Sequence, residues 1–216
     1  MPQKGLTREI VVEQALLLLD DVGLDGLNLR ALAARLEVKA PALYWHFSSK
    51  QDLVDEMATA LWREVQAATA PQMGVGWPEG MVRFALGLRR ILMSHRDGAR
   101  LFSGTYLTDA SILEAQEEPL AALVAEGMSL ETAIEISGVL YAYSVGATIE
   151  EQSVAQVSQT DDRYSIESRE SRIDPLRFPL VTAAGRLMFP DPEARFENSV
   201  RRLVAAFAGW GSRPPV

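Results

Sequence analysis

Apolar side chains recur every three or four positions along most of this chain, and that spacing restricts the fold to helices. An early example is the stripe of Val11, Ala15, Leu18 and Val22, which Leu19 widens. The same reasoning predicts further helices over 28–36, from 41, over 50–67, 81–92, 112–125 with an interruption at Pro119, 130–152, 176–187 and 192–209. Neither the alternation typical of strands nor the Asn-Gly pairs typical of hairpins occurs. We therefore predict an all-α protein.

The segment from 130 to about 152 is apolar on nearly every side, which is typical of a helix at a protein's centre or in an interface. Small residues such as Gly138, Ala142 and Gly146 would let a neighbouring helix approach it closely. Residues 153–175 show no apolar periodicity, so we predict a mobile loop there.

Composition excludes several classes of function. The sequence contains no cysteine, which rules out disulfides, thiolate metal sites and a cysteine nucleophile. It holds two histidines and neither G-x-S-x-G nor a glycine-rich phosphate loop, so an enzyme acting through His95 or Glu150 has little support. No cofactor and no metal site are predicted. The N-terminus lacks a signal-peptide pattern and no 18-residue uncharged apolar run occurs, so we expect a soluble cytoplasmic protein without a membrane partner.

The net charge of −8 is unevenly distributed. Residues 1–50 hold six basic and six acidic residues, Lys4 among them, whereas residues 51–216 hold 15 Lys+Arg and 23 Asp+Glu. Within 28–50 four basic residues face one acidic residue. A locally basic N-terminal part on an acidic remainder can bind phosphate while the remainder is repelled.

The stretch APALYWHFSSK, residues 40–50, places three aromatic residues and a histidine at consecutive positions. One helix face cannot bury four consecutive side chains, so at least two must face solvent or a partner. The preceding LEVKA would join two short helices as a helix-turn-helix, with Leu43 and Phe47 facing inward. The outer surface would then carry Ala40, Ala42, Tyr44, Trp45 and His46. We predict that this surface binds double-stranded DNA; the alternative is a small core in which Tyr44 and Trp45 pack under the fourth helix.

The sequence GLDGLNLRALAARLEVKAPALYWHFSSKQDLVDEM resembles the DNA-binding part of TetR-family repressors, and LYWHF followed by a lysine resembles the tetracycline-repressor branch. LRRILMSHRDGARLFSGT, GATIEEQ and ARFENSVRRLVAAF extend the resemblance along nearly the whole chain. It implies a head, residues 1–50, that binds DNA by a helix-turn-helix, and a body, residues 51–216, that binds a ligand and forms a homodimer.

The resemblance also implies roles for individual head residues. Arg30 would reach a guanine edge or a phosphate, and Lys39 and Trp45 would belong to the same surface. Phosphates would be held by Asn28, Tyr44, His46 and Lys50. Ala40 and Ala42 stand where the tetracycline branch reads bases with glutamine and threonine, and alanine can touch only a thymine methyl. Glu37 stands where that turn often has glycine, so it must adopt a left-handed conformation at a cost of about 1 kcal/mol.

In the body, the positions matching the ligand site of that branch are Gln66, Phe84, Leu88, Phe102, Thr105, Tyr106, Tyr141 and Glu150. Phe102 stands where the branch has its metal-ligating histidine, and phenylalanine cannot ligate a hard cation. We therefore reject a tetracycline–magnesium chelate and predict an apolar or aromatic small-molecule effector. Phe84 and Leu88 share a helical stripe and could instead be plain core, while Glu150 could simply be solvated.

The resulting prediction is a ligand-responsive repressor that binds a palindromic operator as a homodimer. Its two recognition helices would enter successive major grooves about 34–36 Å apart. The helices from 130 and from 192 would form the dimer interface, and a ligand would shift the helix over 50–67. The alternative is an all-α ligand-binding or protein-interaction bundle without sequence-specific DNA binding.

Overall fold

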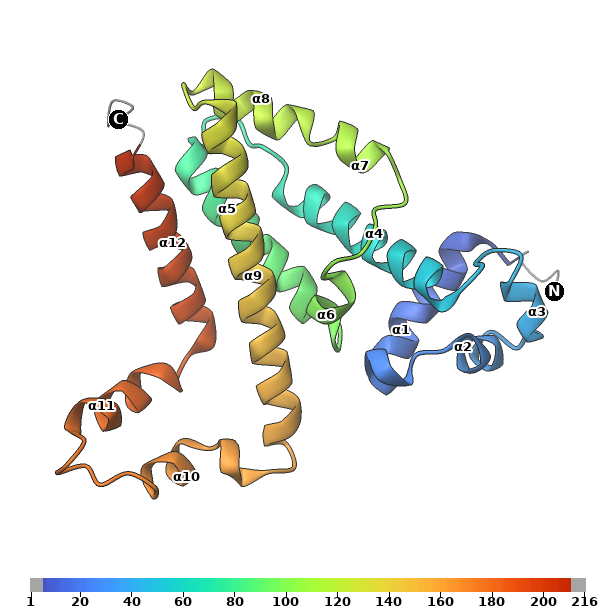
Figure 1. The fold of residues 1–216 in the computed structure, drawn as a ribbon. Helices are drawn as coiled ribbons and strands as arrows, with labels where there is room; N and C mark the ends of the chain where they lie inside the picture. The colour runs from blue at the N-terminus through green and yellow to red at the C-terminus, as the bar shows by residue number, and fades with distance from the viewer. Residues whose placement is uncertain (1–5, 211–216) are drawn as a thin grey trace.

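The structure, a computed structural model, describes residues 6–210, and within this range it is all-α, with no strand (Figure 1). Residues 1–5, with Lys4, and 211–216 lie outside the described residues. The elements are α1 (Arg8–Gly26), α2 (Leu29–Arg35), α3 (Ala40–Leu43), α4 (Lys50–Thr69), α5 (Trp77–Met93), α6 (Gly98–Phe102), α7 (Ser111–Glu114), α8 (Glu117–Ala125), α9 (Leu130–Ser158), the 3-10 helix η1 (Asp162–Tyr164), α10 (Ile166–Glu170), α11 (Pro179–Met188) and α12 (Pro192–Trp210). The predicted fold class is confirmed.

Helices α1, α2 and α3 pack together at one end of the molecule, and α4 leads from them into the remaining helices (Figure 1). The side chains of Leu43 and Phe47 are fully buried there, as the spacing of four predicted. Glu37 in the turn has a φ of 55°, the left-handed conformation expected of it. Val38 closes the turn with a hydrogen bond from its N–H to Ala33 O at 3.0 Å.

The body is built around α5, which packs against α4, α9 and α12 (Figure 1). Two clusters of buried apolar residues result. One spans α1 to α6 and so joins the head to the body. The other lies among α5, α8, α9 and α12 and includes Ile136, Leu140 and Val200.

Two predictions about local structure were wrong. Val22, placed in the stripe of the first helix, is 39% exposed, and helical geometry is interrupted directly after it, at Gly23 (φ 72°). Residues 153–175 are not one loop: α9 continues to Ser158, and η1 and α10 follow. Side-chain caps explain these short helices, since Ser165 accepts a hydrogen bond from Ser168 N–H at 3.0 Å.

The helix over 112–125 is interrupted, but not at Pro119 as predicted: the break lies earlier, between α7 and α8. Pro119 occupies the first turn of α8, where an N–H has no intrahelical partner to lose. Within 6–210, no helix has the length and apolarity needed to cross a bilayer.

Candidate functional site

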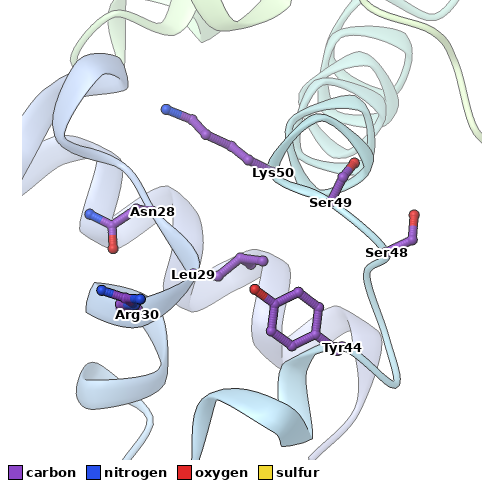
Figure 2. A pocket seen from close by; sticks show the side chains of 7 residues that line it. All are labelled: Asn28, Leu29, Arg30, Tyr44, Ser48, Ser49 and Lys50. Atoms are coloured by element: carbon purple, nitrogen blue, oxygen red, sulfur yellow. The ribbon is translucent and has the colours of Figure 1, made fainter.

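A notch of about 590 Å³ opens on the head where α2, the end of α3 and the start of α4 meet (Figure 2). Asn28 and Arg30 line one side and Ser48 and Ser49 the other, with the Tyr44 ring between them. Leu29 and Lys50 complete the lining. Hydroxyl, amide and cationic groups therefore converge on one exposed surface, which is the donor set that phosphate oxygens require.

The local sequence fixes the geometry of this notch. Asn28 caps α2 by accepting a hydrogen bond from Ala31 N–H at 2.9 Å, and its amide donates to Gly26 O at 2.9 Å. Ser49 caps α4 by accepting from Asp52 N–H at 3.1 Å. Lys50, the first residue of α4, extends across the notch so that its Nζ donates to Leu24 O at 3.0 Å (Figure 2).

The cations of this surface are not neutralised by acids. Arg30, Lys39 and Lys50 form no salt bridge with any residue in 6–210. Other head cations are paired: Arg35 with Asp21 at 2.5 Å, and Arg8 with Glu56 at 2.9 Å. Among residues 6–50, the cations without an acidic partner therefore lie beside the notch and at the start of α3.

The aromatic residues of 44–47 fall into a buried one, Phe47, and two exposed ones, Tyr44 and Trp45, because consecutive side chains point to different sides. Trp45 is 89% exposed and Tyr44 is 58% exposed, whereas His46 is half-buried. The alternative in which Trp45 and Tyr44 pack under the fourth helix is thereby excluded; the buried ring is that of Phe47, over which the Arg8 guanidinium lies at 4.4 Å. Ala40 and Ala42 are partly buried, with Ala40 packed against the core, so less of each methyl group is accessible than predicted.

A second candidate site is a cluster of four aromatic rings in the body. Trp62 of α4 contacts Phe84 of α5, Phe102 of α6 and Tyr141 of α9, with centroid distances of 6.3, 5.2 and 6.3 Å. Three of these rings were predicted from the sequence, but the central one, Trp62, was missed. Its Nε1 is buried and has no hydrogen-bond partner in the described structure. Burial raises the pKa of the Tyr141 hydroxyl further above neutrality, where this group is protonated and can donate a hydrogen bond.

The other predicted ligand residues lie in different surroundings. Leu88 is fully buried in the core, and the Gln66 amide donates to Ile112 O at 2.9 Å. Thr105 Oγ1 donates to Phe102 O at 2.9 Å. Tyr106 is 74% exposed and Glu150 is exposed, so the side chains of these two residues do not join the four rings.

Polar contacts join the end of α1 to the start of α6 and so connect the head to the body. Asp20 accepts hydrogen bonds from His95 Nδ1 at 3.0 Å and from Arg96 N–H at 2.9 Å. Asp97 Oδ2 accepts from Leu24 N–H at 2.9 Å. We call these contacts the head–body junction. His95 is accordingly engaged in a structural contact with Asp20.

Two glutamines of α9 form hydrogen bonds with the body segment of this junction. Gln152 donates to Leu92 O at 2.9 Å and His95 O at 2.8 Å, and its Oε1 accepts from Ala99 N–H at 3.2 Å. Gln156 donates to Asp97 Oδ1 at 2.9 Å. Burial by itself would raise the pKa of Asp97, but the hydrogen bonds from Gln156 and Leu24 outweigh it, so the pKa lies below its ordinary value. Asp97 is therefore ionised at neutral pH.

The part of the chain that the structure describes contains no group of three or more His, Cys, Asp or Glu side chains able to hold a metal ion. Phe102, whose sequence position suggested an apolar replacement for a metal ligand, is buried among the aromatic rings. The chemistry of this cluster is dispersion, aromatic stacking and hydrogen bonding.

Comparison with known families gives two matches that together span most of the chain. The model described as "Bacterial regulatory proteins, tetR family" matches residues 11–57, and the model described as "Tetracyclin repressor-like, C-terminal domain" matches residues 70–208. The first match covers the surface around the notch, and the second contains three of the four aromatic rings.

Individual relatives agree over nearly their full lengths. The chain is 34% identical to the class G tetracycline repressor protein of Vibrio anguillarum, covering 94% of this chain and 93% of the relative. It is 38% identical to the class A protein from transposon 1721 of Escherichia coli, covering 92% and 88%. Among solved structures, TetR from Acinetobacter baumannii AYE is similar with a TM-score of 0.76 and 31% identity, covering 96% of this chain and 100% of that one. TetR(class A) in complex with 5a,6-anhydrotetracycline and magnesium is similar with a TM-score of 0.70 and 29% identity, covering 94% of this chain and 99% of that one.

Proposed function

Because the chain belongs to the tetR family of bacterial regulatory proteins, and is thus a ligand-responsive, dimeric DNA-binding repressor rather than an enzyme, we propose which of its residues perform each task. The head, residues 1–50, binds the operator, and the body, residues 51–216, binds the effector and the second subunit. Its site of action is the cytoplasm, where bacterial operator DNA lies.

The unneutralised cations beside the notch are the single observation that carries the DNA-binding proposal. Arg30 and Lys39 have no acidic partner in the described range, so binding phosphate breaks no existing ion pair. Asn28, Tyr44 and His46 supply further donors to the backbone, and Lys50 reaches the same surface. These residues position the head on the duplex, and base edges are read by neighbouring side chains.

Base reading by this head depends on apolar contact. Ala40 and Ala42 offer only methyl groups, which complement the thymine methyl in the major groove. Trp45 projects from the same region with 89% of its surface exposed, so it supplies the largest contact area on the recognition surface. We therefore propose that the operator half-site carries thymine methyl groups opposite these residues.

The dimer interface is proposed on α9 and α12, which lie side by side (Figure 1). Exposed apolar residues on α9 include Ile134 and Val139, and a Cβ added to Gly138 or Gly146 would meet nothing within 4 Å. A face of small and apolar residues that its own chain leaves uncovered supports close packing of the second subunit.

The effector site is proposed at the aromatic cluster, which includes Phe84, Phe102 and Tyr141. Leu88, Gln66, Thr105, Tyr106 and Glu150 take no part in the ring contacts, and we propose that they meet the effector only once it is bound. A ligand entering here must displace α4, because Trp62 of that helix fills the centre of the cluster. Since α4 also begins at the notch, its displacement moves the head, and the effector favours the state that cannot bind DNA.

The test is selection of bound duplexes from a randomised DNA pool, followed by affinity measurement on the selected site at several salt concentrations. We expect an inverted repeat and a steep loss of affinity with added salt. The variant Arg30→Ala/Lys50→Ala should weaken operator binding at least about 100-fold. It should also make the plot of log affinity against log salt concentration less steep, by about two in slope. Arg172→Ala/Arg177→Ala removes the same charge from exposed body positions and should change neither quantity appreciably.

Failure to enrich any duplex at low salt would refute the DNA-binding proposal and favour the bundle without DNA recognition. Equal losses in the two double variants would show that binding depends on net charge alone, which would refute the assignment of Arg30 and Lys50.

A further inference from the structure

We propose that the effector is a planar aromatic molecule carrying an uncharged hydrogen-bond acceptor, such as a carbonyl oxygen, which binds the Nε1–H of Trp62 without a metal ion. This inference rests on the proposed effector site and adds the chemical class of the ligand. It concerns a residue that the sequence did not single out.

The first supporting observation is the unsatisfied indole N–H. Trp62 Nε1 is buried and has no acceptor among the described residues, although buried polar groups in proteins are nearly always hydrogen-bonded. The T-shaped contacts of Trp62 with Phe84 and Tyr141 offer only ring faces and edges, which are weak acceptors compared with a carbonyl oxygen. A donor of this kind is satisfied when a ligand brings the acceptor.

The second observation is the composition of the cluster around that donor. The neighbouring rings belong to Phe84, Phe102 and Tyr141, and they come from three different helices. Phe102 and Tyr141 also contact each other, with 6.1 Å between their centroids. Ring faces and edges at these separations are complementary to another flat ring, which can stack among them.

The third observation concerns charge. The four cluster residues have uncharged side chains, and no metal-holding group of His, Cys, Asp or Glu exists in the described range. A charged acceptor would be desolvated here without compensation, whereas a neutral one gains a hydrogen bond. The Tyr141 hydroxyl supplies a second donor beside the Trp62 N–H. Ser144, about one turn further along α9, has a buried Oγ with no partner in the described structure.

The experiment compares 9-fluorenone with fluorene, two planar tricyclic probes that differ essentially by one carbonyl group. Each is titrated into the intact wild-type protein and into Trp62→Phe, which keeps an aromatic ring but lacks the donor. We expect the wild type to bind fluorenone about tenfold more tightly than fluorene, and Trp62→Phe to bind the two about equally. Excess EDTA should leave the wild-type affinities unchanged.

The indole signals in a ¹⁵N–¹H spectrum report the contact directly. The signal missing from Trp62→Phe identifies Trp62, and in the wild type it should move downfield with fluorenone but not with fluorene. The inference is overturned if neither probe binds, if the two bind equally to the wild type, or if the preference persists in Trp62→Phe. The comparison within the wild type stands even if the variant does not fold.

Operator binding in the same samples separates this inference from the proposed function. A protein that prefers fluorenone through Trp62 but binds no DNA would refute the repressor assignment and leave the ligand class intact. A protein that binds its operator but shows no carbonyl preference would refute only the ligand class.

Discussion

Replacing Gly23 by alanine tests whether the head–body junction depends on a glycine-specific backbone conformation. Gly23 has φ 72° and ψ 173°, a region that residues with a Cβ almost never occupy. A Cβ added there would lie 2.9 Å from Asp97 Oδ2 and 3.2 Å from Arg96 Nε. The substitution would therefore strain the backbone and push apart the two sides of the junction.

The expected magnitude follows from these two effects. Occupying this backbone region costs a non-glycine residue about 1–3 kcal/mol. The added methyl group also disturbs the hydrogen bond from Leu24 N–H to Asp97, and a weakened bond of this kind costs about 1 kcal/mol. Gly23→Ala should lower the free energy of unfolding by about 2–4 kcal/mol.

Denaturant unfolding followed by circular dichroism, at one fixed protein concentration, measures this change. Gly80→Ala is the matched control, because Gly80 lies within α5 without a positive φ and its added Cβ would meet nothing within 4 Å. That variant should be as stable as the wild type or slightly more stable. If Gly23→Ala unfolds at the wild-type midpoint with an unchanged slope, the proposed strain at the junction is wrong.

Three further outcomes are expected. Asp97→Asn keeps a residue that tolerates the left-handed φ of 57° but removes the charge. Because the pKa of Asp97 is lowered in the folded protein, the wild type should be about 1 kcal/mol more stable than this variant at pH 7. Unfolding measured at a series of pH values should show that this advantage is lost as the pH falls below about 4. Trp45→Ala should weaken operator binding about tenfold or more in a gel-shift titration without changing the melting temperature, since its side chain is 89% exposed; a lowered melting temperature would contradict this. Arg89→Leu should destabilise the fold by about 2 kcal/mol in denaturant melts because Glu151, paired with it at 2.8 Å, loses its partner, and the double variant with Glu151→Leu should recover part of that loss.

The features that sequence reasoning predicted well are those set by neighbouring residues along the chain. The inward direction of Leu43 and Phe47 follows from their spacing of four, whereas the left-handed conformation of Glu37 was implied by the resemblance of its turn to one that often holds glycine. Helix periodicity likewise gave the approximate positions of the long helices, because apolar residues recur every three or four positions along the buried face of each.

The features that it missed depend on pairs of residues far apart in sequence. Trp62 lies next to the fully buried Leu61, and nothing in its immediate neighbours shows that Phe102 and Tyr141 will contact it. The junction contact of Asp20 with His95 joins residues 75 positions apart. The short helix α10 was missed because its stability comes from a capping serine and not from an apolar stripe.

The head–body junction also bears on how a dimer binds two half-sites at once. When one head is seated on its half-site, the second binds as an intramolecular event at an effective concentration set by how narrowly its position is confined. Asp20 and Asp97 hold each head at a second point besides α4, which narrows the volume that the head can explore. Loosening either contact would therefore weaken binding to the complete operator while leaving the affinity of one head for one half-site unchanged.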